Sequence, residues 1–231
     1  MIEGFRLGVF SRGATLWDGL DFAFADAAAW FVAGPPSSGK TLLLSILRGE
    51  RRPDAGDVVV SGESLYRGNA AHSRAWRASC GHVPEQSAAG GRLTVGDLFR
   101  PSALAGGGVR ASERKDRADR LLGMVGLTGA MEWRVSELSI SERVRAYLAA
   151  ELLRGPKVLF CDAVVAGAGT PWREMLWGLF RALAREGNTI VLAERTIPER
   201  WALAAGDSVP VGPFRVYRLP VPGAGPKGEP G

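Results

Sequence analysis

The sequence predicts an α/β fold that has an antiparallel β segment at its N-terminus and a helical subdomain inserted farther along. Apolar runs of strand length recur between helical patterns, at 29–33, 157–162 and 189–195. Two short strand-like segments, 5–10 and 20–24, flank a turn near the N-terminus and favour an antiparallel start. Capped segments with helical spacing fill the stretch from about 87 to 150, which we expect to be the helical subdomain.

Residues 34–41, Gly-Pro-Pro-Ser-Ser-Gly-Lys-Thr, fit the phosphate-binding pattern G-x-x-x-x-G-K-[ST], the Walker A motif or P-loop. An apolar strand enters this loop and an apolar helix, 42–47, leaves it, which is the context that the pattern requires. In such a loop, backbone N–H groups and the lysine bind phosphate, and the threonine hydroxyl binds Mg²⁺. The predicted nucleotide-binding residues are Gly34, Pro35, Ser37, Ser38, Gly39, Lys40 and Thr41.

The alternative for this stretch is a Gly/Ser turn that precedes a lysine by chance. Only four of the 29 basic residues are lysines, so a lysine at position 40 disfavours that alternative. Pro36 has no N–H to donate, and Ser37 stands where many such loops have a glycine. We therefore expect a P-loop NTPase core whose nucleotide affinity these two residues alter.

Composition sets the expected domain organisation. The 231 residues are 46% hydrophobic and 23% charged, which suits a single domain over 1–219 followed by a disordered Pro/Gly-rich tail over 220–231. The formal charge of +5 comes from scattered arginines without a basic run, so we expect no nucleic-acid partner. Neither a secretory signal nor an apolar stretch of membrane-spanning length is found, so we expect a cytoplasmic protein.

Three further stretches carry a family resemblance. They are RPDAGDVVVSGESL at 52–65, CGHVPEQ at 80–86 and LSISERVR at 138–145, in this order after the P-loop. The chain from about 5 to 206 resembles the ATP-binding cassette (ABC) ATPase superfamily. Its layout is most similar to the cell-division ATP-binding protein and the lipoprotein-release ATPases.

The resemblance implies roles for individual residues. Phe10 matches the aromatic residue that stacks on adenine, although an aromatic residue at a strand end is otherwise part of the core. Ser139 lies in the signature that reaches the nucleotide of a second subunit, although it is equally suited to cap a plain helix. Thr41, Asp162 and Glu85 match the positions around Mg²⁺, with Glu85 replacing a glutamine.

Several positions depart from the family pattern. Ile140 replaces a signature glycine, and Gly169 replaces an aspartate of the dimer contact. Ala163 stands where the family has the glutamate that acts as general base, which leaves open whether the protein is an enzyme. Glu194 and Arg195 replace Thr-His, so Glu194 is a candidate displaced base and Arg195 a candidate γ-phosphate contact.

The function expected from this resemblance is that of an ATP-binding subunit with degenerate catalytic motifs. It would bind ATP and Mg²⁺, form a homo- or heterodimer, and couple ATP to an integral membrane partner at the inner face of the cell membrane, with weak or absent hydrolysis. The first alternative is a catalytically silent scaffold for protein–protein interaction. The second is a small-molecule kinase of the P-loop class, which would need an acceptor-binding base and lid arginines.

Overall fold

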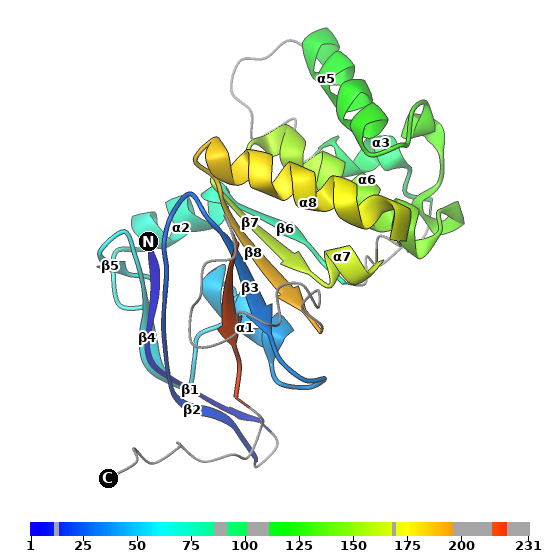
Figure 1. Ribbon diagram of the computed structural model, residues 1–231. Helices are drawn as coiled ribbons and strands as arrows, with labels where there is room; N and C mark the ends of the chain where they lie inside the picture. Colours follow the sequence, from blue (N-terminus) through cyan, green and yellow to red (C-terminus); the bar gives the residue numbers. More distant parts are fainter. Residues whose placement is uncertain (12–13, 86–91, 101–110, 168–169, 196–213, 221–231) are drawn as a thin grey trace.

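The computed structural model describes residues 1–11, 14–85, 92–100, 111–167, 170–195 and 214–220. Gly169, most of the tail predicted over 220–231 and parts of the predicted helical subdomain lie outside these residues. The remaining chain forms a mixed α/β fold with one antiparallel and one parallel sheet (Figure 1). The predicted fold class is confirmed.

Strands near the N-terminus form an antiparallel sheet with the strand order β2-β1-β4-β5. Its strands are β1 (Ile2–Ser11), β2 (Ala14–Phe24), β4 (Ala55–Val60) and β5 (Glu63–Ser64). The register of the first pair runs from Ile2 opposite Phe24 to Ser11 opposite Ala14, with irregularities between. Both strands are longer than the predicted segments because the hairpin continues through these irregularities.

The second sheet is parallel, in the order β6-β7-β8-β3-β9. Its strands are β6 (Cys80–Val83), β7 (Val158–Asp162), β8 (Thr189–Glu194), β3 (Ala29–Ala33) and β9 (Phe214–Arg218). Every residue of β3, β7 and β8 is buried, as expected for a parallel sheet that is covered on both faces. Because β3, β8 and β7 pair in parallel, their carboxyl ends meet at one edge of the sheet.

Helices cover both faces of the parallel sheet (Figure 1). On the face toward the antiparallel sheet, α1 (Lys40–Leu47) packs in one core cluster with Phe160 of β7 and Val191 of β8. On the other face, α6 (Ile140–Arg154) and α8 (Thr170–Arg185) pack against Leu159 and Leu192. Alternate residues of each strand thus enter different cores.

The remaining helical elements are short or lie away from the sheets. They are α2 (Ala70–Ser79), α3 (Val95–Leu98), α5 (Ala111–Met124), the 3₁₀ turns Ala130–Glu132 and Val135–Glu137, and α7 (Val164–Gly167). Thr94 caps α3, because its side chain accepts a hydrogen bond from the N–H of Asp97. The helices α3, α5 and α6 share a third core cluster, so the helical part has its own apolar centre.

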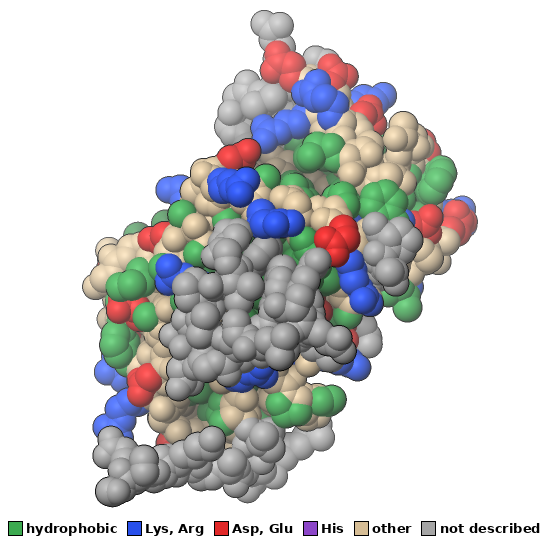
Figure 2. Space-filling model, viewed as in Figure 1, with side chains coloured by type: hydrophobic (Ala, Val, Ile, Leu, Met, Phe, Trp, Pro, Cys, Tyr) green, Lys and Arg blue, Asp and Glu red, His purple; other side chains and the backbone are tan. Residues whose placement is uncertain are grey.

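Charged side chains of both signs are interspersed over the face shown in Figure 2. Among the described residues, no helix is long and apolar enough to cross a membrane.

Removing a buried aromatic ring from the parallel sheet tests this packing. Phe160 is fully buried beneath α1, so Phe160→Ala is expected to lower the free energy of unfolding by about 3–5 kcal/mol in urea denaturation. Met124 is 59% exposed, and Met124→Ala is expected to change that energy by less than about 0.5 kcal/mol. Equal effects of the two variants would contradict the assignment of Phe160 to the core.

Candidate functional site

The P-loop connects the end of β3 to the start of α1. Ser37 has a φ of 62° and Gly39, which precedes the helix, has a φ of 87°. Only glycine fits readily at 39, because a Cβ there would lie 2.3 Å from Cζ2 of Trp17 in addition to the positive φ. The indole Nε1 of Trp17 donates a hydrogen bond to the carbonyl oxygen of Ser38 at 2.8 Å. The antiparallel sheet thereby supports the loop from below.

The ammonium group of Lys40 lies over its own loop. Its Nζ donates to the carbonyl oxygens of Gly34 at 2.7 Å and Pro35 at 2.8 Å, and is 3.4 Å from Oγ of Ser38. Burial lowers the pKa of this amine, and the carboxylate of Asp162 acts in the opposite direction. The loop therefore holds a cation where the P-loop pattern predicts one.

Asp162 ends β7 and faces the start of α1. It is 4% exposed, and burial raises the pKa of its carboxyl group while a hydrogen bond from the hydroxyl of Thr41 lowers it. The adjacent hydroxyl and carboxylate are oxygen ligands of the kind that Mg²⁺ prefers, so these two residues fit a magnesium ion. Among the described residues, no group of three His, Cys, Asp or Glu could hold a metal alone, so further ligands must come from elsewhere.

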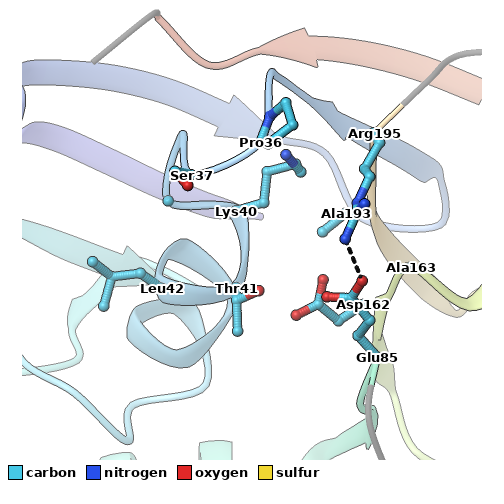
Figure 3. A pocket seen from close by; sticks show the side chains of 11 residues that line it. Pro36, Ser37, Lys40, Thr41, Leu42, Glu85, Asp162, Ala163, Ala193 and Arg195 are labelled. Carbon is cyan, nitrogen blue, oxygen red and sulfur yellow. Dashed lines mark hydrogen bonds and ion pairs between the residues drawn. The ribbon is translucent and has the colours of Figure 1, made fainter. Parts of the chain in front are cut away.

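These groups line a pocket of about 360 Å³ at the carboxyl edge of the parallel sheet (Figure 3). Its lining consists of Pro36, Ser37, Gly39, Lys40, Thr41, Leu42, Glu85, Asp162, Ala163, Ala193 and Arg195. The structure thus brings together most of the predicted P-loop residues, the predicted metal residues and Arg195. The pocket has two cations, two hydroxyl groups and two carboxylates in one small volume, which suits a phosphate ester with a divalent metal.

Glu85 and Arg195 form an ion pair along one wall of the pocket. Arg195 follows β8 and extends toward Glu85, which follows β6 (Figure 3). The guanidinium Nη2 donates to Oε1 of Glu85 at 2.9 Å. The predicted magnesium ligand Glu85 and the predicted γ-phosphate contact Arg195 are therefore both in the pocket, where they bind each other.

Ala163 presents only a methyl group to the pocket. Its N–H donates to the carbonyl oxygen of Ala193 at 2.8 Å, and its φ of 51° turns the chain into α7. No carboxylate extends from this position, where a general base is expected by resemblance. The pocket wall at this point is apolar.

Glu194 lies on the other face of the sheet. Strand alternation places Ala193 in the core with α1, so the next side chain faces α7. The carboxylate of Glu194 accepts a hydrogen bond from the N–H of Val165 at 2.8 Å and another from that of Ala166. It does not line the pocket, so its placement does not support the role of displaced base.

Ser139 caps α6 and lies outside the pocket lining. Its hydroxyl accepts a hydrogen bond from the N–H of Glu142, whose carboxylate accepts one from the N–H of Ser139 at 2.8 Å. Arg145 is buried, donates to the carbonyl oxygen of Val125 at 2.6 Å and lies 4.0 Å above the ring of Trp172. This geometry is that of the plain capped helix, and a contact with a second subunit stays a prediction.

Phe10 also lies outside the pocket lining. It is near the end of β1 and is 49% exposed, and its N–H donates to Asp54 at 2.8 Å. Its exposure argues against the alternative of a core residue, and adenine stacking stays a prediction. Sequence analysis missed Trp17, because its position gives no sign that β2 passes beneath the P-loop.

The parallel sheet and its phosphate pocket define the class of P-loop nucleotide-binding proteins. A model of the family described as "ABC transporter" matches residues 17–166. The chain therefore belongs to the ABC transporter family.

Curated relatives support this assignment. The chain is 32% identical over 188 residues to the Nod factor export ATP-binding protein I of Paraburkholderia xenovorans (strain LB400), covering 80% of this chain and 59% of the relative. It is 33% identical over 196 residues to the daunorubicin resistance ATP-binding protein DrrA3 of Streptomyces coeruleorubidus, covering 83% and 59%. The chain thus spans about three fifths of the length of these relatives.

A solved structure shares the fold. The structure entitled "Dimeric Structure of MJ0796, a Bacterial ABC Transporter Cassette" superposes with a TM-score of 0.80 at 19% identity, covering 97% of both chains. This likeness confirms the mixed α/β cassette fold.

The pKa of Glu194 gives a test of its placement. Burial raises that pKa from its ordinary value to about 7, so the folded protein binds the proton more tightly than the unfolded chain does. The stability that this proton supplies is complete below pH 4.5 and is lost as the pH rises through 7. We expect Glu194→Gln to gain about 2–3 kcal/mol in unfolding free energy relative to wild type between pH 5 and pH 8.

Glu186→Gln removes a carboxyl group from an exposed position and is the matched control in urea denaturation at both pH values. A pH-independent difference between Glu194→Gln and wild type would contradict the buried carboxyl group.

Proposed function

We propose that this chain is the nucleotide-binding subunit of an ABC transporter complex, and that it binds Mg-ATP with weak or absent hydrolysis. One observation carries the proposal: the pocket combines Lys40, Thr41 and Asp162 with a methyl group at Ala163. Lys40 and the P-loop N–H groups bind the phosphates, and Thr41 and Asp162 hold Mg²⁺. Bound Mg²⁺ neutralises charge on the phosphates.

The proposed low turnover follows from the missing base. A positioned general base typically accelerates a reaction by about 10²–10⁴-fold. The carboxylate of Glu194 accepts hydrogen bonds from backbone N–H groups of α7 on the opposite face of the sheet, and the guanidinium group of Arg195 is a donor without an acceptor atom. Binding depends on other groups, so ATP affinity need not fall with the rate.

A membrane complex is proposed from the relatives. Their names describe export of Nod factor and resistance to daunorubicin, and the chain covers 59% of each of those two proteins. An integral membrane partner would place this chain at the cytoplasmic face of the membrane, with the helical subdomain over about 87–150 as the docking part. The relatives' transport names favour transport over a cell-division or lipoprotein-release role, and that finer grouping stays a prediction.

The proposed subunit pairs with a second cassette to form a dimer. We propose one nucleotide-binding domain over 1–219, with Phe10 against the adenine and Ser139 reaching the nucleotide of the second subunit. Ile140 is 63% exposed beside Ser139, where its branched side chain hinders close approach of backbone to phosphate. In a heterodimer, a second subunit with a complete signature would close over the nucleotide of this chain without such a hindrance.

Nucleotide affinity tests the binding half of the proposal. Lys40→Ala is expected to weaken Mg-ATP binding at least tenfold in calorimetry, because it removes the cation of the phosphate loop. Lys157→Ala removes an exposed lysine far from the P-loop and is expected to leave the affinity unchanged. Absence of ATP binding by folded wild type would refute the proposal and favour the catalytically silent scaffold.

Turnover tests the catalytic half. Ala163→Glu supplies a carboxylate at the pocket wall and is expected to raise steady-state ATP hydrolysis about a hundredfold. Ala163→Gln has nearly the same shape without a base and is expected to stay at the wild-type rate. Rapid hydrolysis by wild type, or equal rates for these two variants, would contradict the missing base as the cause.

A further inference from the structure

The two cations of the pocket each have a partner within the protein. Lys40 bonds to carbonyl oxygens of its own loop, and Arg195 bonds to the carboxylate of Glu85. The two partners differ in kind, because the carbonyl oxygens are neutral and the carboxylate is charged. An incoming phosphate must therefore displace a negatively charged partner from Arg195, but only neutral partners from Lys40.

The ion pair is placed so that an exchange of partners is favourable. The side chains of Arg195 and Glu85 are 62% and 39% exposed, and ion pairs this open to water are weak. A phosphate group accepts two parallel hydrogen bonds from a guanidinium group and carries more negative charge than a carboxylate does. Arg195 therefore gains by leaving Glu85 for a phosphate in the same pocket.

The position of the pair points to the far end of the nucleotide. Arg195 lies on the wall formed by β8, with Ala193 beside it, whereas Lys40 lies on the P-loop wall (Figure 3). A P-loop cradles the α- and β-phosphates and its lysine reaches the β- and γ-phosphates, so the third phosphate is the group that would lie nearest the opposite wall and Arg195. A diphosphate lacks that group.

We propose that Arg195 is the residue that distinguishes ATP from ADP, and that Glu85 is its counter-ion until the third phosphate displaces the carboxylate. The proposal rests on the proposed function, because it concerns the nucleotide of the same pocket. It gives Glu85 a role opposite to that of a magnesium ligand. A ligand strengthens ATP binding, whereas a competing counter-ion weakens it.

Affinities of Mg-ATP and Mg-ADP for four proteins test the exchange: wild type, Arg195→Gln, Glu85→Gln and the double variant. Arg195→Gln is expected to weaken ATP about tenfold and ADP less than twofold, because only ATP has the third phosphate. Glu85→Gln is expected to tighten ATP about three- to fivefold by removing the competitor. In the double variant, the gain from Glu85→Gln is expected to fall below twofold.

Arg67→Gln is the matched control, because Arg67 is exposed and pairs with Asp57 at 3.8 Å outside the pocket lining. It removes the same charge and is expected to leave both affinities unchanged. Thermal unfolding confirms that each variant folds, and Arg195→Lys replaces Arg195→Gln if that variant does not fold. Lysine keeps the charge without the paired donors, so its ATP affinity is expected to lie between those of wild type and Arg195→Gln.

Three results would overturn the exchange alone. Glu85→Gln could weaken ATP binding, as a magnesium ligand would; it could tighten binding equally with and without Arg195, as simple repulsion would; or Arg195→Gln could weaken ATP and ADP alike. Folded wild type that binds neither nucleotide would overturn both the exchange and the proposed function.

Discussion

The parallel register of β3, β8 and β7 determines where the groups of the pocket lie. Ala33 is opposite Glu194, and Asp162 is opposite Ala193, so the P-loop, the acid and Arg195 all emerge at the same edge. Each of the three strands is buried on both faces, which leaves no room for slippage by one residue. A shift of that size would move Asp162 to the face of α6 and α8 and separate it from Thr41.

Charge in the pocket is stabilised by short-range partners. Lys40 and Asp162 are both buried, and burial disfavours the charged form of each, so both need hydrogen bonds. Loop carbonyl oxygens supply them for Lys40, and Thr41 supplies one for Asp162. Glu85 and Arg195 lie closer to solvent and pair with each other. The groups near the P-loop are thus held by hydrogen bonds, whereas the ion pair at the outer wall is open to exchange of partners. This difference underlies our proposal that the pocket binds ATP and recognises the third phosphate.

The sequence predicted the fold class and the base of the site because both depend on local patterns. The P-loop motif, the apolar strands and the acid at the end of 157–162 are each contained within a few residues. The outer wall depends on contacts between distant residues, since Glu85 and Arg195 are separated by 110 positions. The support from Trp17 requires knowing that β2 passes beneath the loop. The orientation of Glu194 requires knowing which face of β8 meets α1, which no spacing within 189–195 reveals.

The most direct test of our account is the identity of the nucleotide that remains bound to the wild-type protein. The protein would be incubated with Mg-ATP at 25 °C, separated from free nucleotide after successive intervals, denatured and analysed by chromatography. Our account predicts that intact ATP is recovered after many minutes, because the pocket binds the phosphates but Ala163 supplies no base for an attacking water. Recovery of mostly ADP within seconds would contradict it.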